Sequence, residues 1–288
     1  MAQILDGKAV ASAVKSEVGR KVEELNKKGI EVCLAVILAG DDPASKIYVS
    51  NKKKACESLG IISKEFILDS SASEEELIDL INKLNSDKSV NGILCQLPLP
   101  KGINEKKVLN AISPLKDVDA FHPVNVGKIM IGEYDFVPCT PAGIMEILKF
   151  YNIDPNGKNC VVIGRSNIVG KPMAMLLLHK NGTVTVCHSK TNNLKEVCKR
   201  ADILVSAVGK ANFVTSDMIK ENAVVIDVGM NRINGKLCGD VDFENAAKKA
   251  SYITPVPGGV GPMTIAMLMK NTLTAAYKQN GMEPVEEK

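Results

Sequence analysis

The sequence predicts an α/β protein with two αβα domains, an N-terminal domain built on a parallel sheet and a Rossmann-type dinucleotide-binding domain. Apolar runs of strand length alternate with amphipathic runs of helical length along nearly the whole chain, which is typical of parallel sheets covered by helices. A length of 288 residues suits two ordinary domains. The stretch VVIGRSNIVGKP, residues 161–172, reads as a strand, a tight turn and a helix start, a pattern that suits a dinucleotide pyrophosphate.

Composition argues against several classes of protein. The formal net charge is only +3 and the basic residues are scattered, so no nucleic-acid partner is expected; the short run Lys52 to Lys54 is typical of a solvated helix face. The eight cysteines show no C-x-x-C spacing, so neither a metal site nor a disulfide framework is expected, and most should be buried in a reducing compartment. No apolar run reaches the roughly 18 residues of a membrane span, so a cytoplasmic protein without membrane contact is expected.

The first domain is predicted to alternate helices and strands. Valines recur at helical spacing over 10–22 and Gly29 ends that helix, whereas 32–39 is almost wholly apolar, as in a parallel strand covered on both faces. A polar loop over 113–123 and a short β excursion over 127–138 are expected to close the domain. The regular elements before them are helix 7–29, strand 32–39, helix 44–59, strand 64–68, helix 73–85 with a Ser-x-x-Glu capping box, strand 92–96 and helix 104–112.

A second series of the same kind starts after Pro138. The stretch 252–262 is rich in Pro and Gly and should be irregular except at its start, and a last helix, 263–278, has enough apolar residues to return to the first domain. The predicted domains are therefore 1–137 plus 263–288, and 138–262. The expected elements of the second domain are helix 142–151, strand 160–164, helix 168–179, strand 183–187, helix 194–199, strand 203–207, helix 216–220 and strand 224–228.

The glycines of residues 161–172 suit a phosphate-binding turn. Gly164 permits the turn and the close approach of a phosphate, Gly170 lets the helix pack closely on the sheet, and Pro172 falls in the first helical turn. The pattern departs from G-x-G-x-x-G because Ser166 stands where the second glycine is usual. A structural turn between a strand and a helix therefore remains the alternative interpretation.

The end of the next strand indicates which nicotinamide cofactor binds. A carboxylate there accepts the ribose hydroxyls of NAD, whereas basic or hydroxyl groups hold the 2′-phosphate of NADP. Here the strand ends in Cys187, His188, Ser189 and Lys190, with no acid, so NADP is favoured. Arg165 in the glycine turn is a candidate second positive group for that phosphate. The alternative for Ser189 and Lys190 is an ordinary polar loop.

Four residues of the first domain are candidates for a substrate site. Tyr48 and Lys52 lie four residues apart, on one face of the predicted helix, and Gln96 lies at the carboxyl end of its strand, where ligands bind in open α/β sheets. Tyr48 can stack on an aromatic substrate, Gln96 can accept a hydrogen bond from the Lys52 amine, and Asp119 can pair with a planar guanidine-like edge. Taken singly, each residue has the alternative of an ordinary surface or packing role.

Seven segments in order resemble one known family. They are PASKIYVSNKKKACESLGI, GILCQLPLP, SPLKDVDAFHP, GRSNIVGKPM, CHSKT, VIDVGMN and ITPVPGGVGPMT. Together they resemble the bifunctional methylenetetrahydrofolate dehydrogenase/cyclohydrolase family over Leu5 to Ala275. Because seven ordered segments match, the resemblance is far more specific than the glycine turn alone.

The resemblance implies roles for individual residues. Tyr48 is expected to stack on the aminobenzoyl ring of a tetrahydrofolate substrate, Lys52 to be the catalytic acid and base, Gln96 to orient it, and Asp119 to bind the pterin. Further residues are expected to line the folate site, namely Leu97, Pro98, Pro257, Gly258 and Gly259. The expected NADP-binding residues are Gly164, Arg165 and Ser166 at the pyrophosphate and ribose, Ser189 with Arg165 at the 2′-phosphate, Met230 against the nicotinamide, and Thr140 and Gly209.

Three residues depart from the family's pattern. Ala120 stands where Gly is usual, Ala211 where Pro is usual, and Met230 where Ile is usual. None of the three removes a chemical group. The first is expected to shift the loop that holds Asp119 slightly, and the last to alter the packing against the nicotinamide.

The resemblance implies a bifunctional folate enzyme. It would oxidise methylene-tetrahydrofolate with NADP and then hydrolyse methenyl-tetrahydrofolate to formyl-tetrahydrofolate, with Lys52 as acid and base. Because a free lysine has a pKa of about 10.4, the site must lower the pKa of Lys52, and partial burial is the expected cause. The alternatives are a dehydrogenase-only folate enzyme and a non-enzymatic NADP-binding sensor. The family also implies a homodimer formed through the cofactor domain.

Overall fold

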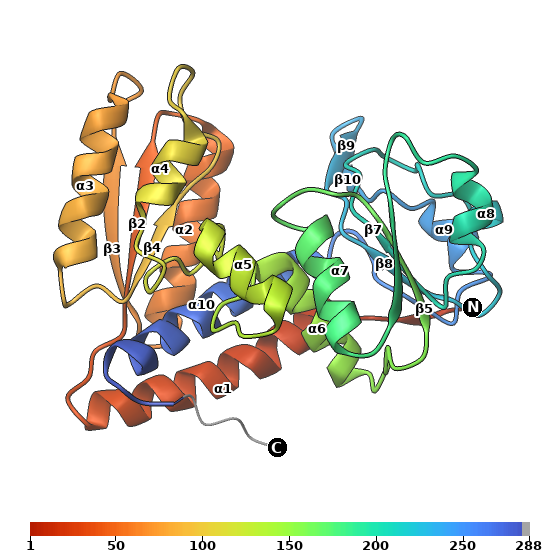
Figure 1. The fold of residues 1–288 in the computed structure, drawn as a ribbon, viewed down its shortest axis with the longest axis horizontal. Helices are drawn as coiled ribbons and strands as arrows, with labels where there is room; N and C mark the ends of the chain where they lie inside the picture. Colours follow the sequence, from red (N-terminus) through yellow and green to blue (C-terminus); the bar gives the residue numbers. More distant parts are fainter. Residues whose placement is uncertain (284–288) are drawn as a thin grey trace. The chain divides into compact units, whose positions relative to one another are not determined.

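The computed structural model describes residues 1–283, which fold into two compact units. One contains residues 1–12 and 138–264 and is here called the six-stranded unit; the other contains 13–137 and the chain from 265 onward and is called the three-stranded unit (Figure 1). The predicted α/β class with parallel sheets is confirmed. No helix among residues 1–283 is long and apolar enough to cross a membrane.

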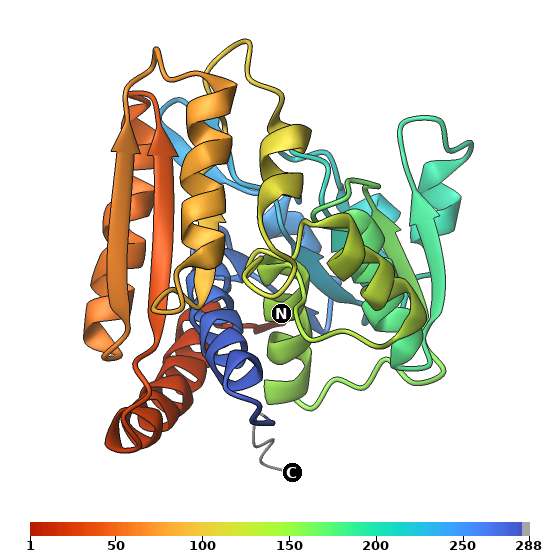
Figure 2. The same cartoon turned by 60° about the vertical axis from the view of Figure 1, so that its left-hand side comes forward.

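The three-stranded unit is a parallel sheet between helices. Its strands, in the order β3-β2-β4, are β2 (Cys33–Ala39), β3 (Ile62–Leu68) and β4 (Gly92–Cys95). Every residue of β2 is buried because this central strand is covered on both faces. The helices α3 (Glu74–Ser86) and α4 (Glu105–Ala111) cover one face and α2 (Pro43–Ser58) covers the other (Figure 2). The predicted capping box is present, since Ser73 Oγ accepts from Glu76 N and the Glu76 carboxylate accepts from Ser73 N.

The six-stranded unit contains a parallel sheet in the order β1-β11-β8-β7-β5-β6. Its strands are β1 (Gln3–Ile4), β5 (Asn159–Ile163), β6 (Thr183–Cys187), β7 (Ile203–Ser206), β8 (Val224–Asp227) and β11 (Tyr252–Ile253). The predicted boundaries assigned residues 1–12 to the other domain. Residues 1–12 belong instead to the six-stranded unit, because β1 pairs in parallel with β11, a strand about 250 residues away in the chain.

The helices of the six-stranded unit are α6 (Cys139–Phe150), α7 (Gly170–His179), α8 (Leu194–Cys198), the 3₁₀ turn η1 (Ser216–Met218) and α9 (Phe243–Ala246). Of these, α7, α8 and η1 are shorter than predicted, α6 begins before the predicted residue 142, and α9 was not predicted. Two long helices, α1 (Gly7–Lys27) and α10 (Val260–Gln279), begin in this unit and continue in the other. Contacts such as Cys56 Sγ to Met269 Sδ, at 3.5 Å, tie α10 to the three-stranded unit. All eight cysteines are free and seven are buried, as predicted.

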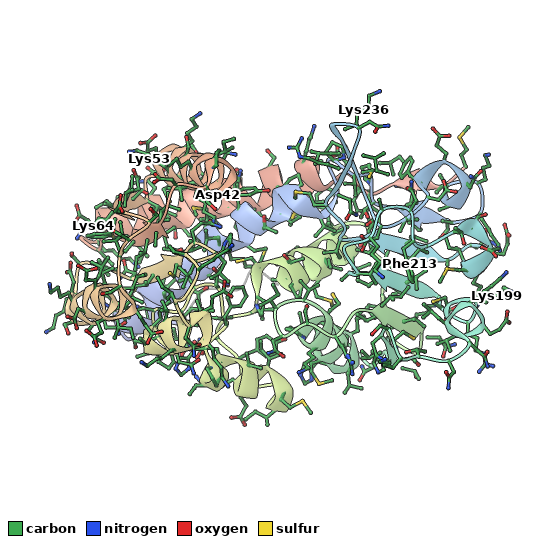
Figure 3. All side chains as sticks on the ribbon, turned by 90° about the horizontal axis from the view of Figure 1, so that it is seen from above. Asp42, Lys53, Lys64, Lys199, Phe213 and Lys236 are labelled. Atoms are coloured by element: carbon green, nitrogen blue, oxygen red, sulfur yellow. The ribbon has the colours of Figure 1, made fainter. Side chains whose placement is uncertain are left out.

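A β-hairpin follows β8 that the sequence reasoning missed. The strands β9 (Asn231–Ile233) and β10 (Lys236–Cys238) are antiparallel, and Lys236 lies at their exposed tip (Figure 3). Asn234 and Gly235 join them with positive φ angles of 49° and 79°. An Asn-Gly pair between two short strands is a strong hairpin signal, so the local sequence contained the information.

The predicted β excursion over 127–138 is wrong. A helix, α5 (Pro123–Ile131), occupies the first part, and residues 132–138 form no strand. The helix starts because Pro123 lies in its first turn and the His122 side chain accepts a hydrogen bond from Val124 N at 3.1 Å. It ends at Gly132, whose φ of 83° is left-handed.

The packing of α6 can be tested at Gly143, with Gly127 of α5 as a helical glycine in open surroundings for comparison. A Cβ at Gly143 would lie 2.5 Å from Met263 Cβ, whereas a Cβ at Gly127 would meet nothing within 4 Å. We expect Gly143→Ala to lower the free energy of unfolding by about 1–3 kcal/mol through overpacking, and Gly127→Ala to raise it by roughly 0.5–1 kcal/mol through helix propensity. Urea unfolding of both variants checks this. Two shifts of the same sign would contradict the prediction.

Candidate active site

The side chains of Lys52 and Gln96 are joined by a hydrogen bond in the three-stranded unit. Lys52 Nζ donates to Gln96 Oε1 at 2.7 Å, as the sequence reasoning anticipated. The Gln96 amide is oriented by its own Nε2, which donates to the carbonyl of Leu97 at 2.6 Å, so its oxygen faces the lysine. Lys52 is in α2, and Gln96 is the first residue after β4. Lys52 is half-buried.

The start of α2 presents Tyr48 one helical turn before Lys52. Asp42 caps the helix, since its carboxylate accepts from Ser45 N at 2.8 Å and from Ser45 Oγ at 2.7 Å, and Pro43 occupies the first turn. Tyr48 is 43% exposed, so its ring has a face accessible to a ligand. The helix therefore offers an aromatic ring and an amine on neighbouring turns.

Asp119 lies beside the carboxyl end of β4. The chain before it runs along this strand, because Ile93 N donates to the Lys116 carbonyl at 2.7 Å and Ile93 pairs in parallel with Asp117. Asp119 lies in the turn that follows, which is closed by Ala120 N donating to the Asp117 carbonyl at 3.1 Å. Burial raises the pKa of the Cys95 thiol to about 12, and the charge of Asp119 contributes to this rise. The candidates on α2, β4 and this loop thus gather at one end of the sheet.

A buried carboxylate holds the loop that carries Asp119. Asp117 accepts hydrogen bonds from Phe121 N at 3.2 Å, His122 N at 2.8 Å and Asn125 Nδ2 at 2.8 Å. Burial raises the pKa of Asp117 above its ordinary value, and these three donors oppose that rise. Ala120 is buried inside the loop with a left-handed φ of 57°, a conformation that explains why glycine suits this position.

In the six-stranded unit, the two glycines of the predicted turn are required by backbone packing. Gly164 has a φ of 131°, and a Cβ there would lie 2.5 Å from the carbonyl oxygen of Ala207. A Cβ at Gly170 would overlap the carbonyl oxygen of Gly164. The helix begins at Gly170 and not at Ile168 as predicted. Ser166 Oγ accepts from the backbone N–H groups of Val169 and Gly170, at 3.1 and 3.3 Å, before that helix starts.

Arg165 and Ser189 follow two strands whose ends are aligned by the strand register. Ile163 pairs with Cys187, and Gly164 N donates to the Cys187 carbonyl at 2.9 Å, so Arg165 and Ser189 each lie two residues beyond a paired residue. The turn after β6 contains no carboxylate between residues 187 and 191. It is closed by hydrogen bonds from His188 N to Thr191 Oγ1 and from Lys190 N to His188 Nδ1. These residue types fit a nucleotide that carries a 2′-phosphate.

The other cofactor candidates follow the carboxyl ends of strands or open a helix. Gly209 follows β7 and Met230 follows β8, and Met230 is 57% exposed. Thr140 is in the first turn of α6. The stretch Pro257–Gly259 follows β11, contains a cis bond before Pro257, and is closed by Gly259 N donating to the Pro255 carbonyl at 2.8 Å. The Leu97–Pro98 bond after Gln96, in the other unit, is also cis.

Two buried aspartates that the sequence reasoning missed hold the loops after β7 and β8. Asp227 ends β8 and Asp240 follows β10, and both are at most 3% exposed. Backbone N–H groups of residues 208, 209 and 210 all donate to Asp240, and that of Gly229 donates to Asp227. The sequence contained a signal for Asp227, because it is an acid at the end of the apolar run VVID, and charged residues are rare in buried strands unless they have a specific partner.

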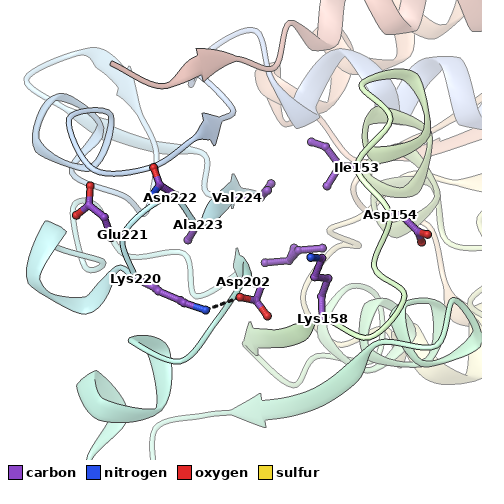
Figure 4. A pocket seen from close by; sticks show the side chains of 10 residues that line it. Ile153, Asp154, Lys158, Asp202, Lys220, Glu221, Asn222, Ala223 and Val224 are labelled. Atoms are coloured by element: carbon purple, nitrogen blue, oxygen red, sulfur yellow. Dashed lines mark hydrogen bonds and ion pairs between the residues drawn. The ribbon is translucent and has the colours of Figure 1, made fainter.

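A cavity of about 270 Å³ in the same unit lies at the opposite end of its sheet. It is lined by residues that precede β5, β7 and β8, including Lys158, Asp202 and Lys220, and the last two form an ion pair at 2.6 Å (Figure 4). Because ligands of parallel sheets bind at the carboxyl ends of strands, this cavity is separate from the candidate site.

Comparisons with known proteins agree for both units. Residues 5–119 match the catalytic domain of tetrahydrofolate dehydrogenase/cyclohydrolase, and residues 138–280 match the NAD(P)-binding domain of the same description. The chain is 63% identical over 283 residues to the bifunctional protein FolD of Acetivibrio thermocellus, and the match covers 98% of this chain and 99% of that relative.

Two solved structures are similar over nearly the whole chain. One is the bifunctional FolD methylenetetrahydrofolate dehydrogenase/cyclohydrolase of Campylobacter jejuni, with a TM-score of 0.95, 53% identity and coverage of 96% of this chain and 99% of that one. The other is the Trypanosoma brucei enzyme complexed with NADP cofactor and an inhibitor, with a TM-score of 0.91, 40% identity and coverage of 96% and 98%.

The buried Asp227 predicts a pH dependence of stability. Burial, with Asp240 beside it, raises the pKa of Asp227 from 3.8 to about 6. Between these values the folded protein binds a proton that the unfolded chain does not, so this group's stabilisation is complete below pH 3.8 and is lost as the pH rises toward 6. Relative to Asp227→Asn, which does not titrate, the wild-type unfolding free energy should fall by up to about 3 kcal/mol between pH 4 and 7.

Urea unfolding at four pH values across this range measures the difference between wild type and variant. The matched control is Asp242→Asn, which removes a partly exposed carboxylate from the same segment. A difference between wild type and Asp227→Asn that does not change with pH would contradict the assignment.

Proposed function

Since the chain belongs to the tetrahydrofolate dehydrogenase/cyclohydrolase family, and has its two activities, we propose that the hydrogen-bonded Lys52 and Gln96 are the centre of its cyclohydrolase chemistry. The enzyme oxidises methylene-tetrahydrofolate to methenyl-tetrahydrofolate with NADP and hydrolyses the product to formyl-tetrahydrofolate. The single observation that carries the proposal is the Lys52–Gln96 hydrogen bond of 2.7 Å at the ligand-binding end of a parallel sheet.

In the oxidation, the residues of the chain mainly position the substrate. NADP supplies the hydride acceptor, and the folate nitrogens stabilise the resulting methenyl cation, so the reaction needs the two reacting carbons held close and aligned. We assign Tyr48 to stack on the aminobenzoyl ring and Asp119 to accept hydrogen bonds from the pterin. The exposed ring of Tyr48 and the rigid loop around Asp119 support these roles. Leu97, Pro98 and the stretch Pro257–Gly259 are proposed to line the folate site.

In the hydrolysis, Lys52 moves the proton. Water attacks the methenyl carbon while the neutral amine Nζ takes one of the water's protons, and the same amine then returns that proton to the nitrogen whose bond to this carbon breaks when the ring opens. The remaining hydroxyl proton passes to solvent as the formyl C=O forms. A cationic substrate beside the ammonium favours release of its proton, because like charges repel. Gln96 accepts one N–H of Lys52 and thereby fixes the direction of the amine. Its amide is itself fixed by Leu97, so the amine has a defined position before substrate binds.

The Lys52–Gln96 pair also separates the competing functions. A dehydrogenase-only folate enzyme is expected to lack part of this pair, and a non-enzymatic NADP-binding sensor would bind the cofactor without turnover. One spectrophotometric assay distinguishes the three, because NADPH formation from methylene-tetrahydrofolate and loss of methenyl-tetrahydrofolate are separate signals.

Replacing the lysine tests its role. We expect Lys52→Met to lower cyclohydrolase turnover by at least about 10²-fold, the usual contribution of a general acid or base, while NADP binding is retained. The assay follows the hydrolysis of added methenyl-tetrahydrofolate. Lys53→Met is the matched control, because Lys53 is exposed and pairs with Glu65 at 2.9 Å. Full hydrolysis by Lys52→Met would refute the assignment.

We propose that Arg165 and Ser189 bind the 2′-phosphate of NADP, and that Gly164, Ser166, Thr140, Gly209 and Met230 line the rest of the cofactor. Two observations support this choice of cofactor: the register aligns the ends of the strands that Arg165 and Ser189 follow, and residues 187–191 contain no carboxylate.

Removing the Arg165 guanidinium should therefore discriminate between the two cofactors. We expect Arg165→Ala to weaken NADP binding by about tenfold or more and NAD binding much less, because only NADP has the 2′-phosphate that a charged hydrogen bond would hold. Calorimetric titration with each cofactor measures both affinities. Arg200→Ala, which removes an exposed arginine before β7, is the control. Equal losses for NADP and NAD in Arg165→Ala would argue against a phosphate contact.

We propose that the enzyme is a homodimer formed through the six-stranded unit. Among residues 1–283 its outer strand β6 pairs with β5 alone, and Val186 in that strand is 39% exposed, so a strand edge with an exposed apolar side chain is available to a second copy. The cytoplasmic location stays a prediction.

A charge at this edge should weaken the dimer. Val186→Lys is expected to increase the dissociation constant because the buried charge opposes edge pairing. Sedimentation equilibrium gives the constant for wild type, for Val186→Lys and for a control at another exposed apolar residue, Met130→Lys. A monomeric wild type, or a dimer indifferent to Val186→Lys, would exclude this interface.

A further inference from the structure

One carboxylate accepts hydrogen bonds from a whole turn of backbone after β7. Asp240 Oδ2 accepts from Val208 N at 2.7 Å and Gly209 N at 3.1 Å, and Oδ1 accepts from Lys210 N at 2.9 Å. Successive N–H groups that converge in this way form an anion-binding concavity. Here the concavity is filled by a residue of the chain itself, so the conformation of Gly209 depends on that carboxylate.

The same pair of aspartates holds both neighbours of Met230. Asp240 Oδ1 accepts from Asn231 Nδ2 at 3.0 Å, and Asp227 Oδ1 accepts from Gly229 N at 2.8 Å. Asp227 also accepts from Asp240 N and Val241 N, each at 2.9 Å, which fixes Asp240 itself. The loops after β7 and β8 are therefore coupled through two adjacent buried carboxylates.

The backbone is shaped to admit these carboxylates. A Cβ at Gly229 would overlap the Asp240 carboxylate, and a Cβ at Gly239 would overlap that of Asp227. Burying two adjacent acids costs free energy of desolvation, and apolar side chains of similar volume would not have this cost. The two acids, however, provide a fixed set of acceptors for the loop N–H groups, which apolar side chains cannot provide.

We propose that Asp240, supported by Asp227, is a positioning residue for the dehydrogenase reaction, which sets the loops of Gly209 and Met230 against the nicotinamide half of the cofactor. The inference rests on the proposed cofactor site, because Gly209 and Met230 are assigned there. Asp240 acts through the backbone of Gly209 and the side chain of Asn231 and does not touch the reacting atoms.

The two activities of the enzyme allow a test with an internal reference. Asp240→Asn and the milder Asn231→Ala, which removes only one hydrogen bond, are assayed for the KM of NADP and for kcat in the oxidation of methylene-tetrahydrofolate. The same preparations are assayed for hydrolysis of added methenyl-tetrahydrofolate without NADP, and their Tm is measured. Asp242→Asn is the control with the same change of charge in the same segment.

We expect Asp240→Asn to raise the KM for NADP by about tenfold, and Asn231→Ala by a smaller factor, with hydrolysis changed by less than about twofold in both. Equal losses of oxidation and hydrolysis that follow Tm would overturn the inference, because they mark a structural role only. The inference would also be overturned if both variants, Asn231→Ala and Asp240→Asn, were folded and had an unchanged KM for NADP. Should Asp240→Asn fail to fold, Asn231→Ala decides alone. A wild type without NADP-dependent oxidation would instead refute the proposed function.

Discussion

A loop that leaves the end of a buried parallel strand has several backbone N–H groups that need acceptors, and in this protein buried aspartates supply many of them. Asp117 accepts three donors from the loop between α4 and α5 and from the start of α5, and Asp240 accepts three consecutive N–H groups in the loop after β7. Each carboxylate is costly to bury, and its donors offset much of that cost. The positions of Asp119, Gly209 and Met230 all depend on this arrangement.

The proposed catalytic lysine is held by a series of hydrogen bonds. Lys52 is on a helix whose first turn is capped by Asp42, and its amine is held by Gln96, whose amide is held by Leu97. Each polar group in this series has its partner inside one compact unit. A proton-transferring amine held in this way is positioned before the substrate arrives, which is where most of the catalytic benefit of orientation comes from.

Some features were predictable because local sequence encodes them. The glycine turn at Gly164, the capping box at Ser73 and the apolar strand 33–39 follow from residue types at short spacing. The Lys52–Gln96 contact was also anticipated, since Gln96 was expected at the ligand-binding end of its strand and its amide can accept a hydrogen bond from the lysine amine. The helix α5 and the β9–β10 hairpin differ from the prediction although local signals are present in both, namely Pro123 and Gly132 at the ends of the helix and the Asn234–Gly235 pair between the strands.

The sequence by itself determined the α/β class, the family, the choice of cofactor class and the candidate residues, because each is carried by short motifs that can be recognised without knowing which distant residues they contact. Only the tertiary structure decided that Gln3–Ile4 forms the edge strand of a sheet whose other strands lie between Asn159 and Ile253, and that Asp227 and Asp240 share one buried site. Strand pairing and buried polar contacts join residues far apart in the chain, and no local pattern specifies their partners. The loops that hold the proposed cofactor residues are therefore defined by contacts that appear only once the sheet has formed.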